Sequence, residues 1–203
     1  YGGEMSIDDI RISLVSDPAE TFESGSFPGS SYYSAYGQGT ITNAAGKVIS
    51  GDYSALGETP FSAPPEWFNF LHSDPSKLHL KAGGTYTVTF KYRVTREAAY
   101  DDGYFYFLAR TDTGGIPKDK GFTKWRDAAG ETHVRTIVFT LDQYDDYYLA
   151  WGIHNGGGIA IDDIVVTRSP VAEEETFESG NLAVTKFKAT ADPGSGALTS
   201  AGG

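Results

Sequence analysis

Apolar and polar residues alternate through the middle of the chain. Between Thr85 and Val94 the alternation has no break: tyrosine, valine and phenylalanine fall on one side, and threonine, lysine and arginine fall on the other. A period of two residues is typical of a β-strand that buries one face. The pattern therefore predicts a half-buried antiparallel strand over residues 85–94.

Other segments with strand character lie on both sides of this one. Gly103–Thr111 is almost entirely apolar, which indicates burial on both faces, whereas His133–Leu141 and Tyr147–His154 alternate. In the last of these segments, odd-numbered residues such as Trp151 are expected to point inward. Shorter strands are expected over Gly37–Asn43, Val48–Leu56 and Ile159–Thr167.

Helices contribute little to the expected fold. No stretch keeps a helical period over several turns, although residues 65–71 and 142–147 could each hold one helical turn. Aromatic residues make up 14% of the chain and glycine accounts for 25 residues, a composition rich in strand and turn formers. Many short strands separated by turn clusters predict an all-β fold: an antiparallel two-sheet β-sandwich or jelly roll.

Two sequence blocks near the N-terminus recur near the C-terminus in the same order. Ile7-Asp8-Asp9-Ile10 matches Ile161-Asp162-Asp163-Ile164, and Thr21–Gly25 matches Thr176–Gly180. Residue 161 corresponds to residue 7, and residue 177 to residue 22, so the two offsets differ by one residue. Matched blocks at nearly equal offsets predict a tandem array with a repeat of about 155 residues.

The repeat predicts how the chain is divided. Residues 1–16 would be the last strand of a preceding repeat, and residues 176–203 the first strands of the next one. Between them, residues 21–168 would form one complete jelly-roll module, joined by linkers over residues 17–20 and 169–175 that contain proline and acidic residues. The alternative is a single domain whose first and last strands have similar sequences.

Charge and composition exclude several function classes. The net charge of −11 argues against a nucleic-acid-binding protein, because binding to phosphates depends on clustered lysine and arginine. No run of about 18 apolar residues is present to insert into a membrane. The chain has no cysteine, which excludes disulfides, zinc thiolates and cysteine catalysis. The first residue is tyrosine and no signal peptide is visible, so we expect an internal fragment.

Four short motifs follow one another in an order that resembles a known family. They are Thr21–Gly25, Ser50–Leu56, Leu80–Phe90 and Ile161–Ile164. The region from Thr21 to Arg168 resembles the β-jelly-roll carbohydrate-binding modules of the family 4 and 9 type. It is also similar to the modules of bacterial cleaved adhesins. The resemblance implies a jelly roll that binds a polysaccharide or glycan.

Acidic residues in apolar strands suggest a cation site. Asp162 and Asp163 are adjacent in a segment otherwise made of isoleucine and valine, where a carboxylate needs a partner. Calcium binds carboxylate and carbonyl oxygens. The resemblance implies a structural Ca²⁺ held by Glu23, Asp52 (through its carbonyl), Asp162 and Asp163. Alternatively, Asp163 caps a turn or pairs with lysine or arginine, while Asp162 is solvated.

The aromatic residues exceed what one core needs. Periodicity assigns six of them to the core: Phe22, Phe90, Phe105, Phe107, Phe139 and Trp151. A surplus is expected on outer faces and in loops: Tyr32, Tyr33, Tyr36, Trp67, Tyr100, Tyr104, Tyr106, Trp125, Tyr144 and Tyr148. Flat rings stack on the apolar C–H faces of sugars. The candidate ligand-binding residues are Trp67, Tyr104, Tyr106, Arg110, Trp125, Tyr148 and His154.

The residues do not predict an enzyme. The four histidines are scattered, and no Gly-x-Ser-x-Gly turn is present. Glycoside hydrolysis needs two carboxyl groups that face each other, but Glu4 of the first repeated block is replaced by Gly158 in the second, so one module lacks this acid. Two functions remain. One is a carbohydrate-binding or adhesive module repeated for avidity in a secreted or cell-surface protein. The other is a structural repeat of an extracellular filament, stalk or surface layer, whose partners are neighbouring copies of the same repeat.

Overall fold

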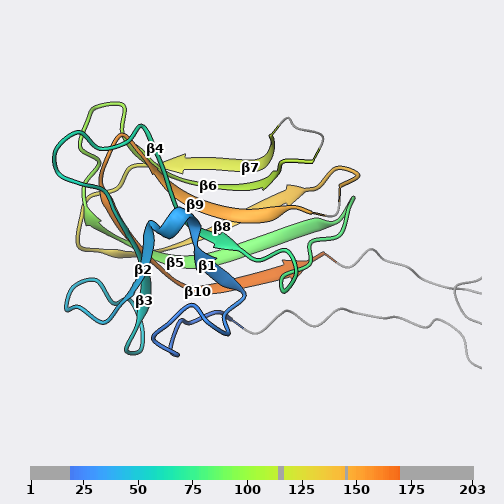
Figure 1. Ribbon diagram of the computed structural model, residues 1–203, viewed down its shortest axis with the longest axis horizontal. Helices are drawn as coiled ribbons and strands as arrows, with labels where there is room; N and C mark the ends of the chain where they lie inside the picture. The colour runs from blue at the N-terminus through green and yellow to red at the C-terminus, as the bar shows by residue number, and fades with distance from the viewer. Residues whose placement is uncertain (1–18, 114–116, 145, 170–203) are drawn as a thin grey trace, which may run out of the picture. The chain divides into compact units, whose positions relative to one another are not determined.

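The computed structural model describes residues 19–113, 117–144 and 146–169, which form one β-sandwich (Figure 1). Two five-stranded antiparallel sheets make up the sandwich. Sheet A has the order β1 (Tyr32–Ser34), β4 (Trp67–Ser73), β9 (Tyr148–His154), β6 (Tyr104–Thr111) and β7 (Lys118–Trp125). Sheet B has the order β2 (Gly39–Thr42), β3 (Ser54–Glu58), β10 (Gly158–Arg168), β5 (Thr85–Arg96) and β8 (Thr132–Thr140).

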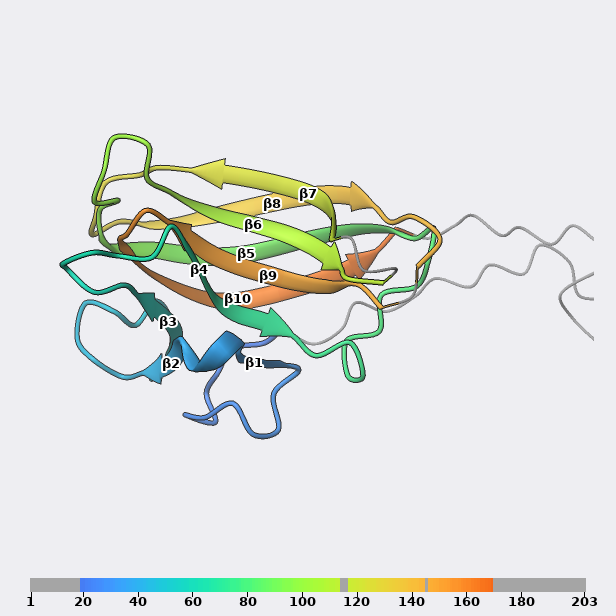
Figure 2. The ribbon, with the colours of Figure 1, turned by 45° about the horizontal axis from the view of Figure 1, so that its top comes forward.

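The fold class predicted from the sequence is confirmed. The long strands of the two sheets run in nearly the same direction in both ribbon views, as in an aligned sandwich (Figure 2). The described residues contain no α-helix; a single 3₁₀ turn, Ala35–Gly37, follows β1. Nothing in the described part of the chain is a helix long and apolar enough to cross a membrane.

Six predicted strands are present within two residues of their expected ends. The strongest is β5, in which Tyr86, Val88 and Phe90 are each at most 4% exposed and the intervening threonines are partly exposed. It pairs antiparallel with β10 on one side and β8 on the other. Central position and unbroken alternation explain why this strand was the easiest to predict.

Three strands of sheet A were not predicted: the short β1, and the longer β4 and β7. The expected helical turn at residues 65–71 is wrong, because Trp67–Ser73 is strand β4. Its partner register shifts between Asn69 and Leu71, so β4 holds one extra residue there and its period of two is broken. Strand β7 lies at the edge of sheet A and is rich in lysine, a composition that suits an edge strand but hides the apolar pattern.

Other boundaries also moved. The segment expected as a strand from Val48 begins only at Ser54, and residues 48–53 form the turn that precedes β3. The second expected helical turn, at residues 142–147, has no helix among its described residues. The regions expected to belong to neighbouring repeats, residues 1–16 and 176–203, lie outside the described residues.

The core lies between the two sheets. The six predicted core aromatics are all buried, and Trp151 of β9 packs edge-on against Phe90 of β5 and Phe107 of β6, at 5.5 and 5.1 Å between ring centroids. Tyr32 was expected outside but is 4% exposed, with its ring 5.8 Å from that of Trp151. The outer-face expectation for Tyr32 is therefore wrong.

Trp125 was expected in a loop, and this placement is also wrong. It ends strand β7 directly opposite Phe105 of β6, and residues paired across strands point to the same face. Phe105 points into the core, so Trp125 does too: it is 7% exposed, 5.2 Å from the ring of Tyr92 and 6.0 Å from that of Phe90.

Candidate functional site

The outer face of sheet A carries a second group of aromatic residues, separate from the core. Strand register aligns them in rows across the sheet: Trp67, His154 and Tyr104 form one row, and Asn69, Gly152 and Tyr106 form the next. Further along the strands come His72 with Ala150 and Leu108, and then Tyr148 with Arg110. We call this outward surface of β1, β4, β9, β6 and β7 the aromatic face.

One cluster on this face is centred on His154. The imidazole of His154 lies between the rings of Trp67 and Tyr104, at 4.4 and 4.5 Å between centroids. Tyr106 and Phe122 complete the group, which we call the His154 cluster. Trp67 is 49% exposed and Phe122 47% exposed, whereas His154 is 9% exposed. The cluster therefore presents exposed aromatic rings around the buried imidazole of His154.

Tyr106 forms the floor between the rows. Its side chain is 1% exposed, and its hydroxyl donates a 2.7 Å hydrogen bond to Oδ1 of Asn69. Burial raises the pKa of Tyr106, so the hydroxyl keeps its proton and remains a donor. The ring crosses β9 at Gly152, where an added Cβ would lie 2.2 Å from Cζ of Tyr106. The floor therefore depends on glycine at position 152.

A second cluster lies at the opposite end of the same strands. His72 is 5% exposed, and its ring lies 4.6 Å from Tyr148 and 5.8 Å from each of Tyr33 and Tyr36. We call these four residues the His72 cluster. Tyr33 and Tyr36 are 42% and 77% exposed, so here too a buried histidine supports exposed rings.

The electrostatics of the His72 cluster keep its histidine neutral. Burial, and to a smaller extent the nearby positive charge of Arg110, lower the pKa of His72 to about 4, while Asp112 acts in the opposite direction. Arg110 is itself held by Asp119 through two hydrogen bonds of 2.7 and 2.9 Å. The Tyr148 hydroxyl donates to Asp112 at 3.2 Å.

Both clusters reach the same face because of β-bulges. The extra residue in β4 places Phe70 and Leu71 inward together, so Trp67, Asn69 and His72 all point outward despite the odd spacing. A second register shift, between Phe107 and Ala109 of β6, brings Phe122 of β7 onto the same surface.

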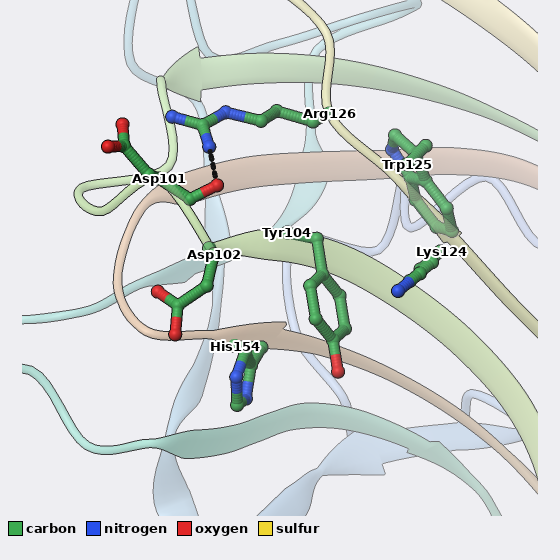
Figure 3. A pocket seen from close by; sticks show the side chains of 8 residues that line it. Asp101, Asp102, Tyr104, Lys124, Trp125, Arg126 and His154 are labelled. Atoms are coloured by element: carbon green, nitrogen blue, oxygen red, sulfur yellow. Dashed lines mark hydrogen bonds between the residues drawn. The ribbon is translucent and has the colours of Figure 1, made fainter.

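A hollow of about 480 Å³ lies at one end of the aromatic face, beside the His154 cluster (Figure 3). Tyr104 and His154 project side by side from β6 and β9 at its base. Arg126 donates to the main-chain oxygen of Asp101. The lining of the hollow includes two acidic and two basic side chains: Asp101, Asp102, Lys124 and Arg126.

The structure gathers six of the seven predicted ligand-binding residues on the aromatic face; Trp125, the seventh, packs against the core and also lines the hollow beside the His154 cluster. Sequence reasoning missed Asn69, His72 and Phe122. Strands β4 and β7 were not predicted, so their residues could not be assigned to either face of a sheet. Tyr33 and Tyr36 were recognised as surplus aromatics, but no pattern placed them next to His72.

The acidic residues predicted to bind calcium have other partners. Asp162 is fully buried and accepts hydrogen bonds from the Ser54 hydroxyl at 2.8 Å and from the Ser50 hydroxyl at 3.2 Å. Asp162 is 0% exposed, so the alternative of a solvated Asp162 is wrong, and this burial raises the pKa of its carboxyl. Asp163 pairs with Lys91 at 2.6 Å, as that same alternative expected.

Glu23, another predicted calcium ligand, also has partners within the protein. Its carboxylate accepts hydrogen bonds from the main-chain N–H of Asp52 at 3.0 Å and of Tyr53 at 3.4 Å. The segments that carry Glu23, Asp52 and Asp162 therefore do meet, because Ser50 of the segment that holds Asp52 also bonds to Asp162. Within the described residues, however, no group of three or more histidine, aspartate or glutamate side chains is arranged to hold a metal ion. Calcium stays a prediction: a lower melting temperature in EDTA would support it, and an unchanged one would remove it.

Comparisons with known proteins support the fold. No protein-family model matches the chain, and no curated protein matches it. Among solved structures, it is similar to the CBM22-1 xylan-binding domain of Xyn10C from Paenibacillus barcinonensis, with a TM-score of 0.58 and 12% identity, covering 80% of this chain and 100% of that one. It is also similar to the K1 cleaved adhesin domain of Lys-gingipain from Porphyromonas gingivalis W83, with a TM-score of 0.52 and 15% identity, covering 75% and 98%.

A third similar structure is the Clostridium thermocellum xylanase 10B CBM22-1-GH10 protein complexed with xylohexaose, with a TM-score of 0.54 and 13% identity. The match covers 81% of this chain and 29% of the xylanase chain. At these identities the likeness shows the fold alone. Carbohydrate-binding modules and cleaved adhesin domains are thus both structural neighbours, while assignment to the family 4 and 9 type stays a prediction.

Proposed function

We propose that this protein is a non-catalytic carbohydrate-binding module that holds a glycan on its aromatic face. The observation that carries the proposal is that exposed aromatic rings gather on one outer face of the sandwich, above a buried polar base. Trp67 and Phe122 are about half exposed, and exposed apolar rings in such a group are typical of binding surfaces. Solved structures with this fold include a xylan-binding domain and a protein complexed with xylohexaose, which supports the same ligand class.

The chemistry of the face suits a sugar. A pyranose presents apolar C–H groups on its flat faces and hydroxyls around its rim. Trp67 and Tyr104 offer flat rings for the first, and Asn69 and the Arg110–Asp119 pair offer polar groups for the second. A mainly apolar surface with a few fixed polar groups is the usual composition of a small-molecule site.

Catalysis is not part of the proposal. Glycoside hydrolysis needs two carboxyl groups that face each other across the scissile bond. On the aromatic face, Asp119 is bound to Arg110, and Asp112 accepts from Tyr148. Both carboxylates are therefore held by side chains of the face itself.

The module is further proposed to repeat in tandem in a secreted or cell-surface protein, where polysaccharides are met. The repeated block Thr21–Gly25 lies at the start of the sandwich, and the repeated block Ile161–Ile164 lies in β10, its last strand. Repeats of that kind raise avidity for a polymer without any new contact. Neighbouring copies of the repeat would be its partners in the chain.

Native gels that contain soluble xylan, galactan or β-glucan test the binding function. We expect at least one polymer to retard the protein, and Trp67→Ala to weaken the binding by at least about tenfold. Val138→Ala is the matched control: Val138 is 62% exposed on β8 of sheet B, so its variant should be retarded like the wild type.

If no polysaccharide retards the protein, or if Trp67→Ala and the wild type migrate alike, the carbohydrate-binding proposal fails. A structural repeat without a specific ligand would then be the better account. Sedimentation of the protein over a concentration series would show whether copies associate.

A further inference from the structure

Both aromatic clusters share two strands. Trp67 and His72 lie on β4, and His154 and Tyr148 lie on β9. From Tyr148 to His154 the register with β6 has no break, and six residues of strand span about 20 Å. One sugar ring is much shorter than this distance, so only an oligosaccharide could contact both clusters.

The surface between the clusters is low. Gly152 and Ala150 of β9 carry no long side chain, and Tyr106, Leu108 and Ala150 form a small buried apolar group of their own. On either side the exposed rings stand at the margins: Tyr33 and Tyr36 by β1, and Phe122 on β7. The aromatic face is therefore open along the strand direction from one cluster to the other.

One polar group stands in the middle of this path with a free donor. Asn69 is partly exposed, and its Oδ1 already accepts from the Tyr106 hydroxyl, which fixes how the amide is turned. Among the described residues nothing accepts a hydrogen bond from its Nδ2, and this atom is not among the buried unpartnered atoms. The Nδ2 donors therefore face solvent.

Fixed charges along the path disfavour an anionic polymer. The guanidinium of Arg110 is neutralised by Asp119, and Asp112 lies beside Tyr148 at the far end. At the near end, Asp101 and Asp102 oppose Lys124 and Arg126 in the hollow. The whole chain carries a net charge of −11. A polyuronate would meet carboxylates at both ends, whereas a neutral chain would not.

We propose that the aromatic face binds one neutral, extended glycan chain lying along β4 and β9, in contact with both clusters, with Asn69 Nδ2 as the central hydrogen-bond donor. The inference rests on the proposed function and adds its ligand class, its direction and a specificity-determining residue. Asn69 is set in place by Tyr106, which in turn depends on Gly152.

Calorimetry with xylo-oligosaccharides from xylose to xylohexaose tests the length requirement; if another polymer retards the protein in gels, its oligosaccharides replace them. Affinity should rise steeply up to a length that reaches both clusters and then level off. Tyr36→Ala and Trp67→Ala should each remove most of the affinity that is gained with length. In each variant, the ratio between the affinities of the longest and the shortest oligosaccharide should fall by at least about tenfold. Thr87→Ala on sheet B is the control.

A disaccharide that binds as tightly as the longest oligomer would overturn the two-cluster inference and leave the carbohydrate-binding function intact. So would a Tyr36→Ala variant with unchanged affinity for the longest chain. Absence of binding to every oligosaccharide and polymer would instead overturn the proposed function itself, and the inference with it.

Asn69→Asp and Tyr106→Phe test the central donor. Asn69→Asp keeps the shape but replaces the amide donors with an acceptor, and Tyr106→Phe removes only the hydroxyl that orients the amide. Each should weaken binding of the longest chain by about tenfold while the melting temperature of Asn69→Asp stays close to that of the wild type. Unchanged affinity in Asn69→Asp would show that the amide does not contact the ligand.

Discussion

The outer faces of the two sheets follow the same strand alternation and yet have opposite chemistry. On sheet B, threonines bond to each other across strands, as in Thr85–Thr140 at 2.8 Å and Thr89–Thr136 at 3.0 Å, and Lys91 pairs with Asp163. On sheet A, the aromatic face leaves large rings half exposed and an amide donor free. The difference teaches that the fold supplies two outer faces, and that within the described part of the chain only the face of sheet A gathers exposed aromatic rings beside a free polar group.

Acid should destabilise the aromatic face through His72. Its pKa in the folded state is about 4, below the usual 6.5, so between these values the unfolded chain binds more protons. The free energy of unfolding should therefore fall by about 3 kcal/mol as the pH drops from 6.5 to 4. Urea denaturation over this pH range measures it.

His72→Phe isolates that effect from other groups. The pKa of Asp162 is raised in the folded state. The stability that Asp162 contributes is therefore present at low pH and is lost as the pH rises through its folded-state pKa. This pH dependence has the opposite sign to that of His72. Arg110, Asp112, Tyr33 and Tyr148 face the imidazole and remain in the variant. A variant with the same pH slope as the wild type would contradict the assignment to His72.

Gly152→Ala should damage the aromatic face with little effect elsewhere. The new methyl group would lie 2.2 Å from Tyr106 and displace its ring, which forms the floor of the aromatic face. We expect a loss of about 2 kcal/mol in the free energy of unfolding and weaker glycan binding. Thermal melting and calorimetry measure the two effects; equal stability of variant and wild type would mean that Tyr106 can move freely.

Asp119→Asn tests why the aromatic face should prefer neutral chains. The substitution leaves the Arg110 guanidinium without its carboxylate partner, at a cost in stability below about 1 kcal/mol because the pair is partly exposed. Polygalacturonate should retard the variant more than the wild type in native gels. If both migrate alike, the Arg110–Asp119 pair does not control the charge preference.

Thr89→Val is the smallest expected effect and probes the other face. It removes one hydroxyl from an exposed cross-strand pair with Thr136, and the replacement suits a strand. Stability should change by less than about 0.5 kcal/mol, with no change in glycan affinity. A clear loss of binding would mean that sheet B also contacts the ligand, and the contrast between the faces would disappear.

Sequence reasoning predicted best what depends on local periodicity. Strand β5 and the inward side of β9 follow from an alternation that is regular from Thr85 to Val94 and from Tyr148 to His154. The same method missed β4, where an extra residue interrupts the period, and β7, where lysines at a sheet edge replace apolar residues. It misplaced Trp125 because its charged neighbours suggested a loop, although its cross-strand partner Phe105 decides its direction.

Contacts between distant segments were beyond the reach of the sequence. The pairing of Asp163 with Lys91 was one alternative among several, and the serines that bond to Asp162 come from the start of β3 and the turn before it, more than a hundred residues earlier. The His72 cluster joins β1, the 3₁₀ turn, β4 and β9. No spacing rule links these segments before the strand order is known.

The extra residue in β4 has a consequence for how such a surface can evolve. Removing Phe70 or Leu71 would restore regular pairing with β9 and still leave Trp67, Asn69 and His72 outward, because Asn69 and His72 already pair with Gly152 and Ala150, which lie two residues apart on β9. A single codon deletion at this point would thus remove one apolar side chain from the core without shortening the recognition surface. Relatives that lack the extra residue should therefore recognise polymers of the same length wherever every ring is retained.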